Sequence, residues 1–213
     1  MQATQIIAVR HGETAWNVET RIQGQLDIAL NETGRWQAQR LARALAAREP
    51  IATIYSSDLL RAWDTAISIA DATRLTLHTH EGLRERGFGI FQGKTYAQIE
   101  ATWPEDAVRW RKREPGWAPP EGESLLDFRQ RILDTVQALA AQHLGERILV
   151  VAHGGVMDVL YRAATGLDLQ APRTWTLGNA AINRLLWTPE GFTLVGWADM
   201  QHLTQDALDE VAG

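Results

Sequence analysis

The stretch IIAVRHGETAWN (residues 6–17) joins four apolar residues to an arginine, a histidine, a glycine and a glutamate. Residues 6–9 predict a short β-strand buried on both faces, because apolar residues follow one another without a polar interruption. Arg10 and His11 do not help such a core, and unpaired charge near apolar surface is costly. The pair therefore indicates a functional site at the end of this strand.

Further strands and helices alternate along the rest of the chain. Apolar runs predict strands at 51–55, 147–152, 180–187 and 192–197. Patterns with helical spacing, two of them after the capping residues Asn31 and Ser124, predict helices at about 31–48, 124–139 and 155–166. This alternation predicts an α/β fold, a three-layer sandwich whose mostly parallel central sheet has helices on both faces. We expect one domain over residues 1–213 with a small cap-like excursion at about 90–122.

Polar residues follow two more of the predicted strands. Ser56 and Ser57 come after one strand, just before a helix that carries Arg61, and His153 follows the strand at 147–152. Ligands of open α/β sheets bind beyond the carboxyl ends of the strands. We therefore expect two histidines and two arginines to meet at one edge of the sheet.

Composition narrows the classes of function. The chain has 213 residues, 45% of them hydrophobic, with no cysteine and a formal net charge of −5, so neither disulfides nor a general affinity for nucleic acid is expected. No apolar run approaches the roughly 18 residues of a membrane span, and the N-terminus shows no targeting segment. We expect a soluble cytoplasmic protein without membrane partners, and a homo-oligomer is an open option.

Six stretches resemble, in order, the sequence blocks of the histidine phosphatase superfamily, which includes the cofactor-dependent phosphoglycerate mutases. They are RHGETAWN (10–17), RIQGQLDIALNETG (21–34), SSDLLRAWDTA (56–66), LRERGFGIFQG (83–93), EGES (121–124) and AHGG (152–155). The resemblance implies a phosphoglycerate mutase-like fold, a nucleophilic His11 that becomes phosphorylated, and Glu85 as proton donor. It also implies a phosphate pocket lined by Arg10, Asn17, Gln23, Gly24, Arg61, His153 and Gly154.

The chemistry of these residues supports the same roles. The planar guanidinium groups of Arg10 and Arg61 can hold a phosphomonoester by paired charge-assisted bonds. The two positive charges also disfavour protonation of His11, which must be neutral to attack phosphorus. His153 can donate to the transferring phosphoryl group, and Gly154 lets the backbone approach an anion. No metal and no cofactor is needed for this reaction.

Three functions fit the sequence to different degrees. The interpretation we favour is a metal-independent phosphatase acting on a small phosphomonoester, because mutases of the family carry a longer insertion between the blocks of Glu85 and EGES. A cofactor-dependent phosphoglycerate mutase is the alternative, and an inactive phospho-ligand binding module is a lesser one. Trp103, Trp110 and Trp117 lie in the excursion, where they either form a wall that selects substrate or pack the loop.

Overall fold

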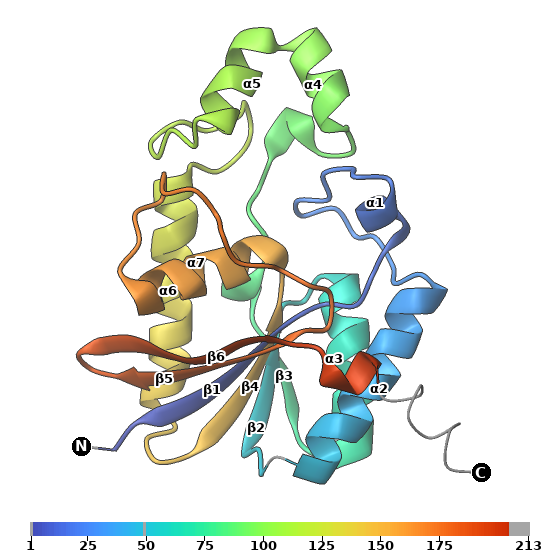
Figure 1. Cartoon of the computed structure of the whole chain (residues 1–213), viewed down its shortest axis with the longest axis vertical. Helices are drawn as coiled ribbons and strands as arrows, with labels where there is room; N and C mark the ends of the chain where they lie inside the picture. Colours follow the sequence, from blue (N-terminus) through green and yellow to red (C-terminus); the bar gives the residue numbers. More distant parts are fainter. Residues whose placement is uncertain (1, 49, 205–213) are drawn as a thin grey trace.

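The structure, a computed structural model, describes residues 2–48 and 50–204. Its strands span Thr4–Arg10 (β1), Thr53–Ser56 (β2), Leu77–Thr79 (β3), Arg147–Ala152 (β4), Ile182–Thr188 (β5) and Gly191–Asp199 (β6). They form one sheet in the order β3-β2-β4-β1-β5-β6 (Figure 1). β3, β2, β4 and β1 pair in parallel, and β5 and β6 add an antiparallel edge. The predicted mostly parallel sheet is confirmed.

Helices cover both faces of this sheet (Figure 1). They span Ala15–Val18 (α1), Glu32–Arg48 (α2), Leu60–Thr73 (α3), Tyr96–Thr102 (α4), Pro104–Arg111 (α5), Leu125–Ala141 (α6) and Gly154–Thr165 (α7). Short 3₁₀ turns occupy Glu81–Leu83, Gly89–Phe91 and Gln201–Leu203. α2 and α3 pack on one face of the sheet, and α6 and α7 pack on the other. The predicted three-layer arrangement is confirmed.

The two faces of β1 and β4 explain their unbroken apolar sequences. Ile6 and Ala8 point into the core under α6 and α7, whereas Ile7 and Val9 point into the core under α2 and α3. β4 alternates in the same way, because successive side chains of a strand face opposite sides. Both central strands are therefore buried on both faces, as their sequences predict.

Local hydrogen bonds confirm two of the predicted helix starts. The Asn31 side chain accepts a 2.7 Å bond from the amide of Gly34 at the start of α2. Ser124 caps α6, because its hydroxyl oxygen accepts from the amide of Asp127 at 3.0 Å. Each bond satisfies a backbone donor that has no partner within the first turn of a helix.

The excursion predicted at about 90–122 holds α4 and α5, which lie at one end of the molecule, apart from the sheet (Figure 1). Its side chains form a third apolar cluster around Phe91, Ile99, Ala107 and Trp117. Trp103 and Trp110 pack against this cluster from its border. Among the residues described, no helix combines the length and apolar character that a membrane-spanning segment requires.

Candidate active site

His11 lies directly beyond β1, at the centre of the candidate site. Its backbone amide donates to the carbonyl of Ala152 at 3.0 Å, so the register between β1 and β4 fixes its position. Its side chain is 2% exposed, and Nδ1 lies 2.7 Å from the carbonyl oxygen of Gly12. A carbonyl oxygen only accepts, so Nδ1 carries the hydrogen and Nε2 keeps its lone pair.

The surroundings of His11 keep its imidazole neutral. Burial lowers the pKa of His11 well below its usual value, and the guanidinium charges of Arg61 and Arg10 lower it further. The protonated form would be a third positive charge in a site with little water to solvate it. At neutral pH the ring is therefore uncharged.

His153 follows β4 and precedes the first turn of α7. Its ring is buried, and the ring centroids of His11 and His153 are 5.4 Å apart. Nε2 lies 2.8 Å from the hydroxyl oxygen of Ser57, which follows β2, whereas Nδ1 has no hydrogen-bond partner among the described residues. Burial lowers the pKa of His153, and the charge of Arg61 lowers it further. The carboxyl ends of three strands thus bring both histidines together, as predicted.

Two arginines complete this group. Arg61, on α3, is almost fully buried and donates to the carbonyl oxygens of Leu26 at 2.8 Å and Gly24 at 2.7 Å. Arg10, at the end of β1, donates to the carbonyl of Leu177. The Nε atoms of both arginines are buried without a hydrogen-bond partner within the described part of the chain. Burial lowers the pKa of Arg61 to about 10, so its guanidinium remains charged at neutral pH.

We call Arg10, His11, Arg61 and His153 the histidine-arginine cluster. Three of its buried nitrogen atoms, the two arginine Nε atoms and His153 Nδ1, have no partner among the residues described. Leaving a buried donor without an acceptor is costly. Two fixed positive charges and unsatisfied donors around one nucleophilic nitrogen are suited to hold an anion such as a phosphoryl group.

Glu85 reaches the edge of this cluster from the chain between α3 and α4. Its carboxylate accepts from the amide of Arg86 at 2.8 Å and from the amide of Gly155 at 2.9 Å. Gly155 must be glycine here, because a Cβ atom would lie 2.2 Å from Glu85 Oε1. Burial lowers the pKa values of Arg10 and Arg61, and the negative charge of Glu85 partly opposes this shift at both guanidinium groups.

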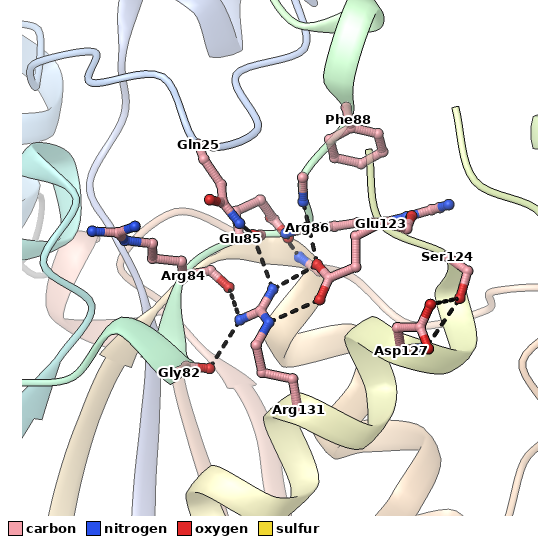
Figure 2. Close-up of polar contacts among 12 residues, drawn as sticks. Gln25, Gly82, Arg84, Glu85, Arg86, Phe88, Glu123, Ser124, Asp127 and Arg131 are labelled. Atoms are coloured by element: carbon pink, nitrogen blue, oxygen red, sulfur yellow. Dashed lines mark hydrogen bonds and ion pairs between the residues drawn. The ribbon is translucent and has the colours of Figure 1, made fainter. Parts of the chain in front are cut away.

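Arg131 of α6 binds the chain around Glu85 (Figure 2). Its guanidinium pairs with Glu123 at 2.7 Å and donates to the backbone carbonyls of Gly82, Arg84 and Glu85. The neighbouring Arg84 turns away and pairs with Asp58. One of the two arginines that flank Glu85 in the sequence therefore faces away from it.

Comparison with known proteins identifies the family. The model of the histidine phosphatase superfamily, branch 1, matches residues 6–200. The chain belongs to this superfamily. Glucosyl-3-phosphoglycerate phosphatase of Mycobacterium tuberculosis is 37% identical over 209 residues, which cover 92% of this chain and 93% of that protein.

Two further relatives support this assignment. Metal-independent phosphoserine phosphatase of Arabidopsis thaliana is 36% identical over 206 residues, covering 95% of this chain and 84% of that protein. The solved structure of Bacillus stearothermophilus YhfR has a TM-score of 0.87 and 33% identity, and the match covers 94% of this chain and all of that one. The resemblance inferred from the six sequence blocks is confirmed at the level of family and fold.

The other residues that the family resemblance placed in the pocket lie around the cluster in different ways. Gly24 adopts a φ of 53°, a conformation that favours glycine, and its carbonyl holds Arg61. Gly154 begins α7, and a Cβ atom there would lie 3.4 Å from Arg10 Nε. Gln23 is buried, and its Oε1 has no hydrogen-bond partner among the described residues.

Asn17 is bound locally. Its Oδ1 accepts from the amide of Thr14 at 3.0 Å, which forms a capping box at the start of α1. It also accepts from Asn179 at 3.3 Å. The structure thus shows Asn17 fixing the loop after His11, and its carbonyl oxygen is already occupied by protein donors.

The sequence did not predict the contacts that three further residues make with the cluster or with the chain beside it. Asn179 donates to the carbonyl of His11 at 2.9 Å, Thr65 accepts from the amide of Gly12 at 3.0 Å, and Ser57 contacts His153. Ser57 was visible as a polar residue at a strand end. Asn179 lies in a loop where no motif marks it, and Thr65 lies within the block SSDLLRAWDTA (56–66), where the resemblance assigned it no role.

A cavity of about 190 Å³ opens beside Glu85, and we call it the Glu85 cavity. Its polar lining includes Glu85, Arg86, Arg113, Asp158 and Arg173, together with the backbone of residues 154–155. Its apolar lining consists of Phe88, Trp110, Leu125, Phe128, Val159 and Leu169. The three tryptophans of the excursion all pack in or against the third apolar cluster, and they differ in whether they also line this cavity. Trp110 lines a cavity, whereas Trp103 and Trp117 pack in the third apolar cluster.

Proposed function

We propose that this chain is a metal-independent phosphomonoester phosphatase that acts through a phosphohistidine at His11 on a small phosphorylated metabolite. The contact between His11 Nδ1 and the carbonyl of Gly12 carries the proposal, because it leaves Nε2 as an unprotonated nucleophile beside two guanidinium groups. The names of the two phosphatase relatives support the same reaction class.

The histidine-arginine cluster binds the phosphoryl group. Arg10 and Arg61 neutralise its charge, and their unpaired Nε–H groups donate to its oxygens. We assign the Ser57 hydroxyl as donor to His153 Nε2, 2.8 Å away, which puts the hydrogen of that ring on Nδ1, where it is available to a phosphoryl oxygen. These fixed donors supply the charge stabilisation that phosphoryl transfer requires.

Two steps complete the reaction. In the first, His11 Nε2 forms a bond to phosphorus while the bond from phosphorus to the leaving-group oxygen breaks, and Glu85 gives that oxygen a proton. In the second, the Glu85 carboxylate takes a proton from water as the water oxygen bonds to phosphorus. The bond between phosphorus and Nε2 then breaks, and inorganic phosphate leaves.

Rapid quenching during turnover of a phosphate-labelled aryl phosphate tests the proposal. We expect a phosphoprotein whose label is lost in acid and survives in base, as a nitrogen–phosphorus bond does, and which maps to His11. Turnover should persist in excess EDTA, because no step uses a metal ion. His11→Ala should abolish labelling and turnover together, while His78→Ala, which changes an exposed histidine, should alter neither.

Other outcomes would select the alternatives. Isomerisation of a phosphoglycerate without release of phosphate would make the chain a mutase. Binding of phosphate without label or turnover would make it a binding module. Loss of activity on chelation, restored by zinc or magnesium, would contradict the metal-independent mechanism.

A further inference from the structure

The peptide group that joins His11 to Gly12 is held by side chains at both of its polar ends. Its carbonyl oxygen, that of His11, accepts from the side-chain amide of Asn179 at 2.9 Å. Its N–H group, that of Gly12, donates to the hydroxyl oxygen of Thr65 at 3.0 Å. Asn179 lies in the loop before β5 and Thr65 lies within α3, so two distant segments of the chain fix one peptide plane.

The chemistry of the partners gives both side chains a single orientation in these contacts. A carbonyl oxygen only accepts, so the NH₂ group of Asn179 faces His11. The Thr65 hydroxyl gives its hydrogen to the carbonyl of Arg61 at 2.8 Å, which leaves a lone pair for the amide of Gly12. Thr65 is fully buried, so bulk water does not compete for this contact.

The peptide held in this way precedes the carbonyl group that sets the tautomer of His11. That carbonyl belongs to Gly12, and its oxygen lies 2.7 Å from Nδ1 of His11. Gly12 must lack a Cβ atom, because one would lie 2.4 Å from the carbonyl oxygen of Gly34. A residue without Cβ rotates more freely about its backbone bonds. The direction of the Gly12 carbonyl therefore needs support from outside, and the preceding peptide is where that support acts.

The loop that carries Asn179 also holds the residue before His11. The amide of Ala180 donates to the carbonyl of Arg10 at 2.9 Å. Ala180 has a φ of 57°, a conformation that residues with a side chain seldom adopt. Strained backbone of this kind persists where the surrounding structure requires it. The loop thus presents two donors in sequence, one to the carbonyl of Arg10 and one to that of His11.

We infer that Thr65 and Asn179 form a peptide clamp, which holds the Gly12 carbonyl against Nδ1 of His11 and so keeps the lone pair on Nε2. This inference rests on the proposed function, in which Nε2 attacks phosphorus. Thr65 and Asn179 are positioning residues, because they act on the reaction through the backbone of residues 11 and 12. If this peptide turns, Nδ1 loses its acceptor and the hydrogen can move to Nε2, where it prevents attack.

Three substitutions within α3 test the peptide clamp. Thr65→Val keeps the shape of the side chain and removes its oxygen, whereas Thr65→Ser keeps the oxygen. Thr73→Val is the matched control, because the Thr73 hydroxyl likewise donates to the carbonyl four residues earlier, that of Ile69, at 2.7 Å. We expect the single-turnover rate of phosphorylation by an aryl phosphate to fall by about 10–100-fold in Thr65→Val, as for a slightly misplaced reacting group. It should stay within about threefold of wild type in the other two variants.

Binding of inorganic phosphate separates this loss from damage to the anion site. The dissociation constant should stay within about threefold of wild type in every variant, because Arg10 and Arg61 remain in place to hold the anion. A phosphorylation rate that is unchanged in Thr65→Val, or that falls equally in Thr73→Val, would overturn the peptide clamp.

The tautomer of His11 is measured directly by nitrogen NMR on protein with labelled histidine, with His11→Asn giving the assignment. In the wild type we expect the hydrogen on Nδ1. In Thr65→Val and Asn179→Ala the signal of Nε2 should shift towards that of a protonated nitrogen, whereas in Thr65→Ser and Thr73→Val it should keep its wild-type position. A general loss of stability does not move a hydrogen between ring nitrogens, so this signal separates positioning from a structural role.

Combining Thr65→Val with Asn179→Ala tests whether the two residues act on one peptide. Once one end of the peptide is free, freeing the other end should add little. The rate of the double variant should therefore lie within about threefold of that of the slower single variant. Losses that multiply would show two independent effects and would contradict a shared clamp.

The outcomes separate this inference from the proposed function. If the wild type forms no phosphohistidine, the proposed function fails, while the NMR signals still report whether the clamp fixes the tautomer. If phosphohistidine forms at His11 and all variants show the same tautomer, the peptide clamp fails and the phosphatase function stands.

Discussion

The histidine-arginine cluster and the Glu85 cavity are neighbours, yet they are built by different means. Three of the four cluster residues lie at the ends of β1 and β4, where the amide of His11 donates to Ala152 across the sheet, and Arg61 reaches them from α3. The cavity is lined by side chains from α5, α6, α7 and three connecting segments. A site fixed by a sheet suits the invariant part of a reaction, and a site built from loops suits the part that differs between substrates.

The same contrast separates chemistry from selectivity. In the proposed reaction, binding and transfer of the phosphoryl group require the same geometry for every phosphomonoester, so we assign them to the histidine-arginine cluster. The leaving group differs between substrates, and it meets the cap segment and the loop of Arg173. Changes in the cluster should therefore affect all substrates, whereas changes in the cavity should affect substrates unequally. Glu85, which lines the cavity at the edge of the cluster, tests this division first.

Glu85→Gln should produce the largest change. The amide keeps the size of the side chain but cannot give a proton to the leaving oxygen, so kcat for alkyl phosphates should fall by roughly 10²–10⁴-fold. Aryl phosphates have a better leaving group and should lose less in the phosphorylation step. Single-turnover phosphorylation measured with both classes of substrate checks this.

Equal losses for alkyl and aryl substrates would remove Glu85 from the acid role. Glu13 would then be the next residue to test, although its carboxylate already accepts a 2.8 Å bond from Asn31. Glu13→Gln serves as the matched control, because it changes a second carboxylate near His11 in the same way. It should retain the wild-type ratio of alkyl to aryl rates.

The pH dependence of stability should report on His11 and His153 of the cluster, with a further contribution from His202, whose pKa is also lowered by burial. Burial holds the pKa values of His11 and His153 well below 6.5, so the unfolded chain binds more protons than the folded chain as the pH falls through about 6.5. The free energy of unfolding should therefore decrease on acidification. From pH 7.5 to 5.5 we expect a loss of roughly 1.4 kcal/mol for each histidine, about tenfold in the unfolding equilibrium.

Urea denaturation of His11→Asn and His153→Asn across this pH range measures each contribution. Each variant should lose about half of the pH dependence that the two histidines cause together. His78→Asn, at an exposed position, should keep all of it. Stability that is flat between pH 7.5 and 5.5 in the wild type would show that the imidazoles are not buried in neutral form.

The cluster could be predicted from the sequence better than the cavity, because strands position the histidines of the cluster and loops position much of the cavity lining. β1 and β4 are visible as unbroken apolar runs, and the residue after each is placed by strand register, so His11 and His153 could be found from the sequence. β3, with three residues on an edge and largely exposed, leaves no such pattern. Family resemblance supplied Glu85, Gln23 and Gly24, whose positions depend on loops.

The cavity could not be read from the sequence in the same way. Arg113 and Arg173 lie 60 residues apart in segments without helical or strand periodicity, and Arg113 is held at the cavity by its contacts with Leu169 and Asp158. Asn179 likewise reaches His11 across 168 positions of the chain. Such contacts arise from tertiary packing, for which a single sequence offers no local signal. The tryptophans of the excursion show the same limit, because the amino-acid sequence does not reveal which of them faces the cavity.

Trp110 allows the smallest and most selective test of the comparison. Its ring lines the Glu85 cavity and packs against Phe88 and Phe91, with centroids 5.9 and 5.7 Å away. Trp110→Leu should raise KM for alkyl phosphates by roughly 3–10-fold, because part of the apolar wall that contacts the leaving group is lost. The hydrolysis rate of the isolated phosphoenzyme should not change, since the leaving group has already departed.

Trp103→Leu is the matched control, because Trp103 packs on Phe91 with ring centroids 5.7 Å apart and does not line the cavity. It should lower thermal stability and leave KM unchanged. If both variants raise KM equally, the cap acts through its overall packing, and the cavity wall does not select the leaving group.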